Sequence, residues 1–343
     1  MLAKLSRIFF STGIIFFTTL LAPSCKNNPD SVGISSVNIN LKMERFDLAL
    51  TENPGEPVEA RLAMLRKEYG NFFNRFTDDI IHINNGDSVV LVSEFKRFLA
   101  DPDFNEVTHA VKDTFKDATA MEKIFGNAFG RYKYYFPEKK IPEVIGFVSL
   151  FNYAIINTDS VLGIGLDMYL GSQSKYYPAL GFPVYKISKM SREYIPADAM
   201  RGWMESEFEP AESKHDFLGQ MIHHGKILYL LKAMMPEEND TLLTGYSSAQ
   251  LKWCYENEKS IWAFFVEKQL LFSSNSELFS KYLSEGPTTN GFPAESPGNI
   301  GTFVGWQIIK AYMKENPEIS PARLMKETDA TIILKDSKYK PKK

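Results

Sequence analysis

The sequence predicts an α+β protein that is mostly helical and has a small central sheet. Across residues 57–81, apolar residues recur at intervals of four and three, which is the spacing of an amphipathic helix. Between residues 143 and 170, short branched and aromatic runs are separated by Asn-Thr-Asp and by glycine, which is typical of adjacent strands. Helical spacing returns after residue 211. Helices on both sides of one short strand-forming region favour the α+β class.

Composition limits the functions that the chain can perform. Its 343 residues are 44% hydrophobic and 13% aromatic, which is enough for one or two domains with a sizeable core. Lys and Arg number 39 against 42 Asp and Glu, so no basic excess is available to neutralise phosphates. We therefore expect no nucleic-acid partner. The two cysteines, Cys25 and Cys254, are too few for a disulfide framework or a cysteine-rich metal site.

The N-terminus predicts export and attachment to a membrane. Lys4 and Arg7 precede a mostly apolar stretch over residues 8–21, which is the pattern of a signal peptide. The stretch closes with Leu-Ala-Pro-Ser-Cys, which resembles a bacterial lipoprotein signal whose cysteine receives a diacylglycerol and becomes the first residue. We therefore expect a signal peptide over residues 1–24 and a lipid on Cys25 that anchors the protein in the cell envelope, facing the periplasm. The alternative is an ordinary secretory signal in which the cysteine is incidental.

The rest of the chain is expected to form one domain with a polar segment at each end. Residues 25–36 are polar and contain proline and glycine, which indicates a flexible tether after the lipidated cysteine. Residues 37–334 are expected to form a single α+β domain whose first strand starts at Val37 and runs towards Asp47, because apolar and polar residues alternate there. Residues 335–343 hold five lysines. They predict a solvated basic tail, with attraction to anionic lipid or to an acidic partner as the alternative.

Periodicity and turn residues set the boundaries of the other elements. Strands are expected within the apolar runs between residues 143 and 170. The segment 171–196 contains three prolines and two glycines, which predict a covering loop. The spacing of apolar residues predicts helices over residues 57–81, 88–99, 103–112, 118–130, 198–208, 211–235, 258–272 and 297–315.

The helix predicted over residues 211–235 is the candidate for chemistry. Its apolar stripe consists of residues spaced alternately by four and three: Phe217, Met221, His224, Leu228, Leu231 and Met235. His223 lies on the flank of this stripe. A zinc helix presents two histidines one turn apart with a glutamate directly after the first, but the corresponding positions hold Gln220 and Met221. We therefore expect His224 to be a hydrogen-bonded histidine of the core or of an interface, and zinc binding is the less favoured alternative.

The sequence predicts no catalytic residue, no metal and no cofactor. Glu267 is a possible third metal ligand in the helix over residues 258–272, but a partly exposed ion pair with Lys226 or Lys268 is the favoured interpretation. Cys254 has no identifiable base partner and is expected to be a core thiol. The chain has no phosphate-binding glycine loop, no dinucleotide-binding turn and no nucleophile elbow.

Two glycines predict close packing of a helix. Gly301 and Gly305 lie one turn apart in the helix over residues 297–315. Glycine inside a helix costs up to about 1 kcal/mol relative to alanine, so we expect both residues to admit the close approach of another backbone.

Long segments of the chain resemble one protein family. Residues 220–230 (QMIHHGKILYL), 245–272 (GYSSAQLKWCYENEKSIWAFFVEKQLLF) and 296–313 (SPGNIGTFVGWQIIKAYM), together with the early MERFD and the Ser-Cys signal, are similar to GldB gliding-motility lipoproteins of Bacteroidota. The resemblance implies a membrane-tethered accessory protein that gliding motility requires. It also implies that the protein acts together with other gliding lipoproteins and the type IX secretion machinery. The resemblance implies no enzymatic activity.

This family is distantly similar to predicted zinc peptidases of the zincin type. The resemblance implies a zincin-like scaffold, in which a sheet is followed by the active helix and by a helix with a third ligand. By position, Gln220, His223 and His224 occupy the active helix and Glu267 the third-ligand region, so these four residues mark a possible degenerate cleft. The implied function is a non-enzymatic scaffold or assembly factor. The alternative is a residual zinc-dependent peptidase or hydrolase of the cell envelope.

Overall fold

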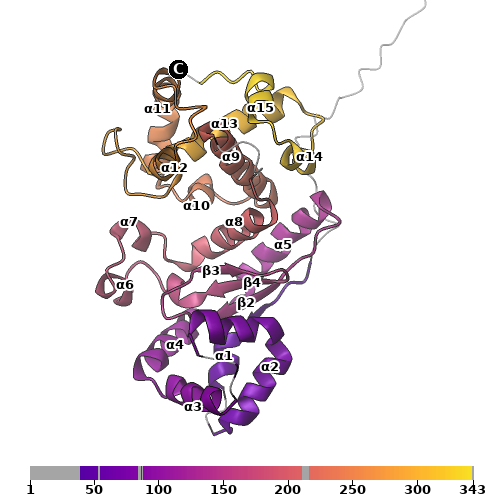
Figure 1. The fold of residues 1–343 in the computed structure, drawn as a ribbon, viewed down its shortest axis with the longest axis vertical. Helices are drawn as coiled ribbons and strands as arrows, with labels where there is room; N and C mark the ends of the chain where they lie inside the picture. Colours follow the sequence, from indigo (N-terminus) through magenta and orange to yellow (C-terminus); the bar gives the residue numbers. More distant parts are fainter. Residues whose placement is uncertain (1–38, 53–54, 84–85, 87, 211–215, 342–343) are drawn as a thin grey trace, which may run out of the picture. The chain divides into compact units, whose positions relative to one another are not determined.

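The computed structural model describes residues 39–52, 55–83, 86, 88–210 and 216–341 (Figure 1). The predicted signal peptide (residues 1–24), the lipid site Cys25 and the tether (residues 25–36) lie outside the described residues. All described residues belong to one unit of the chain. None of the helices formed by these residues has the length and apolar character needed to cross a membrane.

The α+β class is confirmed, since four short strands form one sheet among many helices. The sheet has the order β1-β2-β4-β3, with β1 parallel to β2, β2 parallel to β4 and β3 antiparallel to β4. In its register, Ile145 pairs with Gly163. The strands are β1 (Met43–Arg45), β2 (Glu143–Phe147), β3 (Ile155–Asn157) and β4 (Val161–Gly165). Three of them therefore lie between residues 143 and 170, as the sequence predicts.

The first strand begins later than predicted. Residues 39–42 are not a strand, and β1 ends where α1 (Phe46–Thr51) begins. The side chain of Arg45 donates hydrogen bonds of 2.8 and 2.6 Å to the carboxylate of Asp47, which bends the chain out of the sheet. Phe46 is completely buried and meets Phe72 and Phe76 edge-on at centroid distances of 5.1 and 4.7 Å. Packing of this ring, which alternation does not reveal, favours a helix at Phe46.

The helices before the sheet follow the predicted spacing. The helix expected over residues 57–81 is a continuous run with a kink at Gly70, where φ is 45° and ψ is −118°. This backbone conformation is open to glycine and strained for other residues. The run ends as a π-helix, η1. The five helical elements between β1 with α1 and the rest of the sheet are α2 (Val58–Arg75), η1 (Phe76–Ile80), α3 (Ser88–Leu99), α4 (Pro102–Thr114) and α5 (Thr119–Tyr135).

The segment after β4 is more regular than predicted. It contains four short helical turns followed by a longer helix: η2 (Leu166–Tyr169), α6 (Tyr176–Ala179), α7 (Val184–Ile187), η3 (Arg192–Tyr194) and α8 (Ile195–Glu207). The prolines that predicted a loop lie at positions where helical turns tolerate them, since Pro183 caps α7 and Pro196 lies in the first turn of α8. Proline here limits the length of each helix.

The helices after residue 216 form the remainder of the described chain. They are α9 (Phe217–Met234), α10 (Asp240–Thr244), α11 (Ser248–Glu267), α12 (Ser276–Leu283), α13 (Ile300–Glu315), α14 (Pro321–Lys326) and α15 (Ala330–Asp336). The helix predicted over residues 258–272 corresponds to α11, which begins earlier, at Ser248, and ends earlier, at Glu267. Its start is fixed by a capping box, in which Ser247 and Gln250 exchange side-chain and backbone hydrogen bonds.

The last residues pack on the domain. The boundary predicted at residue 334 falls inside α15, and Lys338 forms an ion pair of 2.8 Å with Glu315 of α13. The hydroxyl of Tyr339 donates a 2.8 Å hydrogen bond to Glu258 of α11. These contacts hold residues 335–339 of the predicted basic tail against two helices.

Helices α9 and α13 approach each other closely, and glycine makes this approach possible. A Cβ atom on Gly305 would overlap the carbonyl oxygen of Met221, and one on Gly225 would overlap the backbone of Gly305. A Cβ on Gly301 would lie 2.6 Å from Leu283 Cδ2 and 2.9 Å from the carbonyl oxygen of Tyr282, at the end of α12. The predicted close approach at Gly301 and Gly305 is therefore confirmed. Cys254 is completely buried, which confirms a core thiol, and burial raises its pKa to about 12.

Gly305→Ala is expected to destabilise the protein strongly. The added methyl group has no room beside the backbone of α9, so α9 and α13 must move apart and lose their packing. We expect the free energy of unfolding to fall by about 3 kcal/mol in urea denaturation. The control is Gly55→Ala, because a Cβ atom there meets nothing within 4 Å. Equal stability of the Gly305 and Gly55 variants would contradict the packing argument.

Candidate functional site

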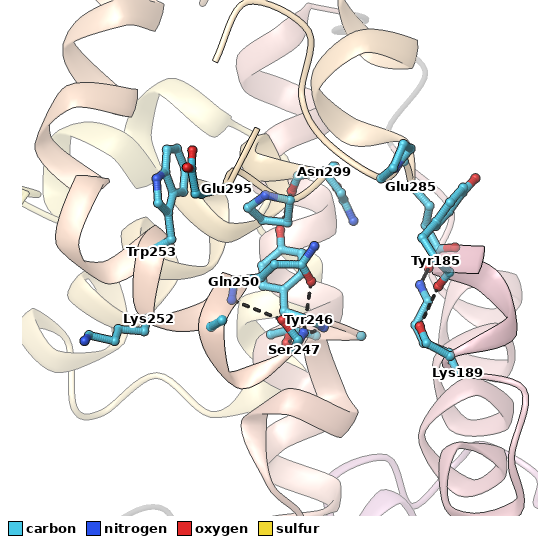
Figure 2. A pocket seen from close by; sticks show the side chains of 18 of the residues that line it. Tyr185, Lys189, Tyr246, Ser247, Gln250, Lys252, Trp253, Glu285, Glu295 and Asn299 are labelled. Carbon is cyan, nitrogen blue, oxygen red and sulfur yellow. Dashed lines mark hydrogen bonds and ion pairs between the residues drawn. The ribbon is translucent and has the colours of Figure 1, made fainter. Parts of the chain in front are cut away.

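A cleft of about 840 Å³ opens between three segments of the described chain (Figure 2). One wall is residues 184–194, which include α7 and η3. The second is residues 244–256, at the end of α10 and the start of α11. The third is residues 285–299, the connection between α12 and α13. Clefts of this volume are typical of binding sites in proteins.

The second and third walls are joined by specific hydrogen bonds. The hydroxyl of Tyr246 donates a 2.8 Å hydrogen bond to the carbonyl oxygen of Asn299, directly before α13. Gly245 ends α10 in the left-handed conformation with φ of 69°, which turns the chain into the capping box of α11. The capping bonds between Ser247 and Gln250 lie at the cleft (Figure 2). The start of α11 is therefore fixed relative to the start of α13.

The third wall is a loop that is closed at its base. The amide of Gly298 donates a 3.2 Å hydrogen bond to the carbonyl of Gly286, and a Cβ atom on Gly298 would overlap the backbone of Gly286. Within the loop, the hydroxyl of Thr289 donates a 2.6 Å hydrogen bond to the carbonyl of Pro297. Two backbone segments thus touch where only glycine fits, and the loop is held in one shape.

An ion pair links the first wall to the third. The amine of Lys189 lies 2.8 Å from a carboxylate oxygen of Glu285 (Figure 2). The lysine side chain is 20% exposed and the glutamate side chain 58% exposed. Burial opposes ionisation of Glu285, but the charge and hydrogen bond of Lys189 outweigh it, so the pKa of this carboxyl is lowered. Glu285 is therefore a charged carboxylate at neutral pH that a ligand can reach.

Aromatic and further charged side chains complete the lining. Tyr185 and Trp253 lie on opposite walls, and Lys252, Glu256 and Glu295 add charges of both signs. Tyrosine and tryptophan are enriched at protein interfaces because they bury large areas while keeping a polar group available. The cleft is thus suited to an amphipathic ligand that carries charges.

A charged face of α8 lies next to the cleft. Asp198, Arg201 and Glu205 are spaced by three and four residues, which places them on one face of the helix. The guanidinium of Arg201 donates a hydrogen bond to the carbonyl of Leu243 in α10, and its charge also acts on Glu285. Burial raises the pKa of Asp198 to about 6, although Arg201 and a 3.1 Å hydrogen bond from the hydroxyl of Tyr169 oppose this.

The two histidines are half-buried and neutral at pH 7. Burial and the charge of Arg201 lower the pKa of His224 to about 4. The pKa of His223 is also lowered to about 4. Burial is the largest cause, and the nearby charges of His224 and Lys226 lower it further. Their rings are 5.7 Å apart, and none of the described residues hydrogen-bonds to either imidazole. The apolar residues of the predicted stripe, from Phe217 to Met235, are buried as expected.

Glu267 is not joined to the histidines. It is exposed at the end of α11, and in the described chain no hydrogen bond or ion pair connects it to Gln220, His223 or His224. The predicted pairing with Lys226 is wrong, because the buried amine of Lys226 donates instead to the carbonyl of Glu327 after α14. Burial lowers the pKa of this amine to about 8.

The described residues do not supply a zinc ligand set. Among them, no group of three His, Cys, Asp or Glu side chains is placed to hold a metal ion. At the positions of a zinc helix, Gln220 is half-buried and Met221 completely buried, and neither offers the imidazole or carboxylate that the chemistry needs. A resident zinc does not fit this donor set.

The cleft was only partly accessible to sequence reasoning. The spacing of Asp198, Arg201 and Glu205 on a predicted helix was a usable signal for a charged face. Lys189 and Glu285 are 96 residues apart, and nothing local in the sequence indicates that they meet. The capping box at Ser247 was also visible, and it would have placed the start of α11 at the cleft.

Comparison with known proteins gives one result. A family model described as gliding motility protein GldB matches residues 26–341. No curated protein and no solved structure matches the chain.

Replacing both histidines is expected to reduce the loss of stability in mild acid. Their pKa values of about 4 in the folded protein lie below the ordinary 6.5, so the unfolded chain binds protons first as pH falls. The stability that the neutral imidazoles contribute is present above pH 6.5 and is lost as pH falls towards 4. Between pH 7 and 5, we expect the wild type to lose about 1–2 kcal/mol per histidine more than His223→Gln/His224→Gln, measured by urea unfolding.

The control for this experiment is His109→Gln. The side chain of His109 is 78% exposed on α4, so its replacement matches the loss of an imidazole without the burial that the α9 histidines have. If the wild type and the double variant lost stability in parallel, the depressed pKa values would be disproved.

Proposed function

The chain belongs to the GldB family of gliding motility proteins, and on this basis we propose that it is a lipid-anchored, non-catalytic assembly factor that binds a partner polypeptide in the cleft. The family match covers almost the whole of the chain beyond the predicted signal peptide. A role in gliding motility follows from the family. The binding mode and the assembly role are our proposal.

The cleft is the observation that carries the proposal. It combines a rigid wall, closed at Gly286 and Gly298, with the accessible ion pair between Lys189 and Glu285. Fixed walls reduce the ordering cost of binding, and charged groups at the rim select a partner with complementary charges. Aromatic side chains such as Trp253 supply apolar area for tight contact. An extended segment of another protein satisfies all three features.

The proposed partners are other gliding-motility proteins or components of the type IX secretion machinery. The predicted lipid on Cys25 would keep the cleft close to a membrane, with the domain facing the periplasm. A tethered binding site gains from a high local concentration of neighbours on the same membrane. This arrangement supports assembly without any chemical step.

We also propose that the scaffold is related to zincin-type peptidases. The order of elements supports this relation, since the sheet precedes α9 with Gln220, His223 and His224, and α11 with Glu267 follows. The donor set does not match a working zinc site, as shown above. The proposal is therefore a peptidase-like framework that now serves binding.

Exchanging the cleft ion pair tests whether it binds a partner or only holds the walls together. Lys189→Glu and Glu285→Lys each place two like charges in contact, whereas the double exchange restores the pair with its polarity reversed. For a binding role, we expect all three variants to lose colony spreading and at least about tenfold of crosslinking to the partner in a strain lacking the native gene.

Rescue of spreading by the double exchange would overturn the binding role, because a purely structural pair functions in either polarity. The matched control is the exposed pair of Lys96 and Glu59, which lie 3.1 Å apart and join α3 to α2. Its exchange is expected to leave spreading unchanged. Immunoblots confirm that each variant accumulates to the same level.

The predicted anchor has its own test. Cys25→Ala removes the thiol that would carry the lipid, so we expect the protein to move from the membrane to the soluble periplasmic fraction and spreading to fail. Persistent membrane association of this variant, measured by fractionation and immunoblotting, would contradict the lipoprotein assignment. Colony spreading by a fully soluble variant would show that the anchor is dispensable.

A further inference from the structure

The segment from α6 to α7 exposes apolar side chains at its tip. Leu180 is 56% exposed and Val184 is 82% exposed. Pro178 and Ala179, directly before Leu180, and Pro183, directly before Val184, are also exposed. We call residues 176–187, which connect the sheet region to α8 (Figure 1), the α6–α7 tip. Apolar side chains gathered in one exposed segment mark an interaction site more often than isolated ones do.

The charged side chains of the segment itself have one sign, although two of its lysines pair with carboxylates from other elements. From residue 168 to residue 192 the chain contains three lysines and one arginine and no Asp or Glu, although acidic residues outnumber basic ones in the whole chain. Lys186 is exposed within α7, two residues after Val184. Lys175 lies just before α6 and pairs with Glu106, 2.5 Å away. Basic groups beside exposed apolar residues are complementary to an anionic lipid surface.

The turn between α6 and α7 pairs three of its backbone amides internally. The amides of Leu180, Gly181 and Phe182 donate to carbonyls at residues 176–178, over distances of 2.9–3.1 Å. Pro178 and Pro183 have no amide hydrogen to satisfy. Unpaired backbone donors are costly at the boundary of a bilayer, where water is scarce. The turn from Leu180 to Phe182 can therefore enter that region with its three amides paired.

The base of the tip is fixed to the protein. Tyr177 is completely buried, and its hydroxyl donates a 3.0 Å hydrogen bond to the carbonyl of Asp167 and accepts one of 2.7 Å from the amide of Leu170. Its ring meets those of Phe151 and Phe182 edge-on at 6.0 and 5.9 Å. Leu180 and Val184 are therefore held outwards by a rigid support rather than exposed by fraying.

We infer that the α6–α7 tip docks on a membrane that contains anionic lipids, with Leu180 and Val184 among the headgroups and Lys186 at the charged surface. The occupant is a lipid surface because the apolar tip, the basic flank and the closed backbone together match an interfacial segment. The inference goes beyond the proposed function and does not rest on partner binding in the cleft.

An environment-sensitive fluorophore tests the inference on the full chain. The native Cys254 is completely buried and the proposed lipid on Cys25 would block that thiol, so the dye can be directed to Leu180→Cys or Val184→Cys. The dye-labelled protein is mixed with vesicles of phosphatidylglycerol and phosphatidylcholine, with and without nitroxide-labelled lipid. We expect a rise in emission of about twofold or more at both positions, and its loss with the nitroxide lipid.

Two comparisons separate the tip from non-specific contact. The positional control is Val89→Cys, since Val89 is a 76% exposed valine on α3 outside the tip. We expect no rise there, although a lipid on Cys25 would bring both positions to the same vesicles. The charge control is Lys186→Glu in the Leu180→Cys background, which is expected to weaken the signal, as are vesicles of phosphatidylcholine alone.

No rise at Leu180 and Val184, or an equal rise at Val89, would overturn the inference and would leave the tip as a surface for protein contact. An emission rise of the same size with lysine or glutamate at position 186, and with anionic or neutral vesicles, would refute the role of anionic lipid. These outcomes are independent of colony spreading in the cleft variants, so either proposal can fail alone.

Discussion

The close contact between α9 and α13 is the constraint on which the second half of the protein depends. Gly225 and Gly305 bring two backbones together, and a single methyl group would separate them. Because α9 also packs against α5, α8, α12 and α15, its position determines where those helices lie. His224 and Arg201 are neighbours because α8 rests on α9 in this arrangement.

The cleft follows from the same contact. Gly301 lets the end of α12 approach α13 at Tyr282 and Leu283, and Glu285 comes two residues later. Asn299, directly before α13, receives the hydrogen bond of Tyr246 and so holds the start of α11. Two walls of the cleft are thus placed by α13. The third wall reaches them through Lys189, so the ion pair closes an arrangement that packing has already set.

Local patterns in the sequence were sufficient for most elements. The spacing over residues 57–81, the strand-forming runs after residue 143 and the paired glycines of α13 each report a local physical requirement, and each is confirmed. The first strand was misplaced because burial of Phe46 and the bond from Arg45 to Asp47 override alternation. The start of α11 was missed because its capping box was not used, although it is visible at Ser247.

The site was harder to predict, because its groups come from distant parts of the chain. The sequence draws attention to His223 and His224, and His224 does lie close enough to Arg201 to feel its charge. The histidines do not line the cleft, whose Lys189 and Glu285 meet only through the tertiary fold. Glu267 shows the opposite error, since its helix exists but its side chain is exposed and away from the histidines.

The first wall of the cleft and the α6–α7 tip share one short rigid element. Val184 belongs to the tip, yet both Val184 and Lys189 lie on the wall of the cleft, with only α7 and one turn between them. Exposed apolar residues on a rigid support contribute little to folding, so their presence at this point is explained better by an external surface than by stability. A tip seated among lipids would place the mouth of the cleft beside the membrane. A partner bound there would then be held at the same surface as the lipid anchor that we propose at Cys25.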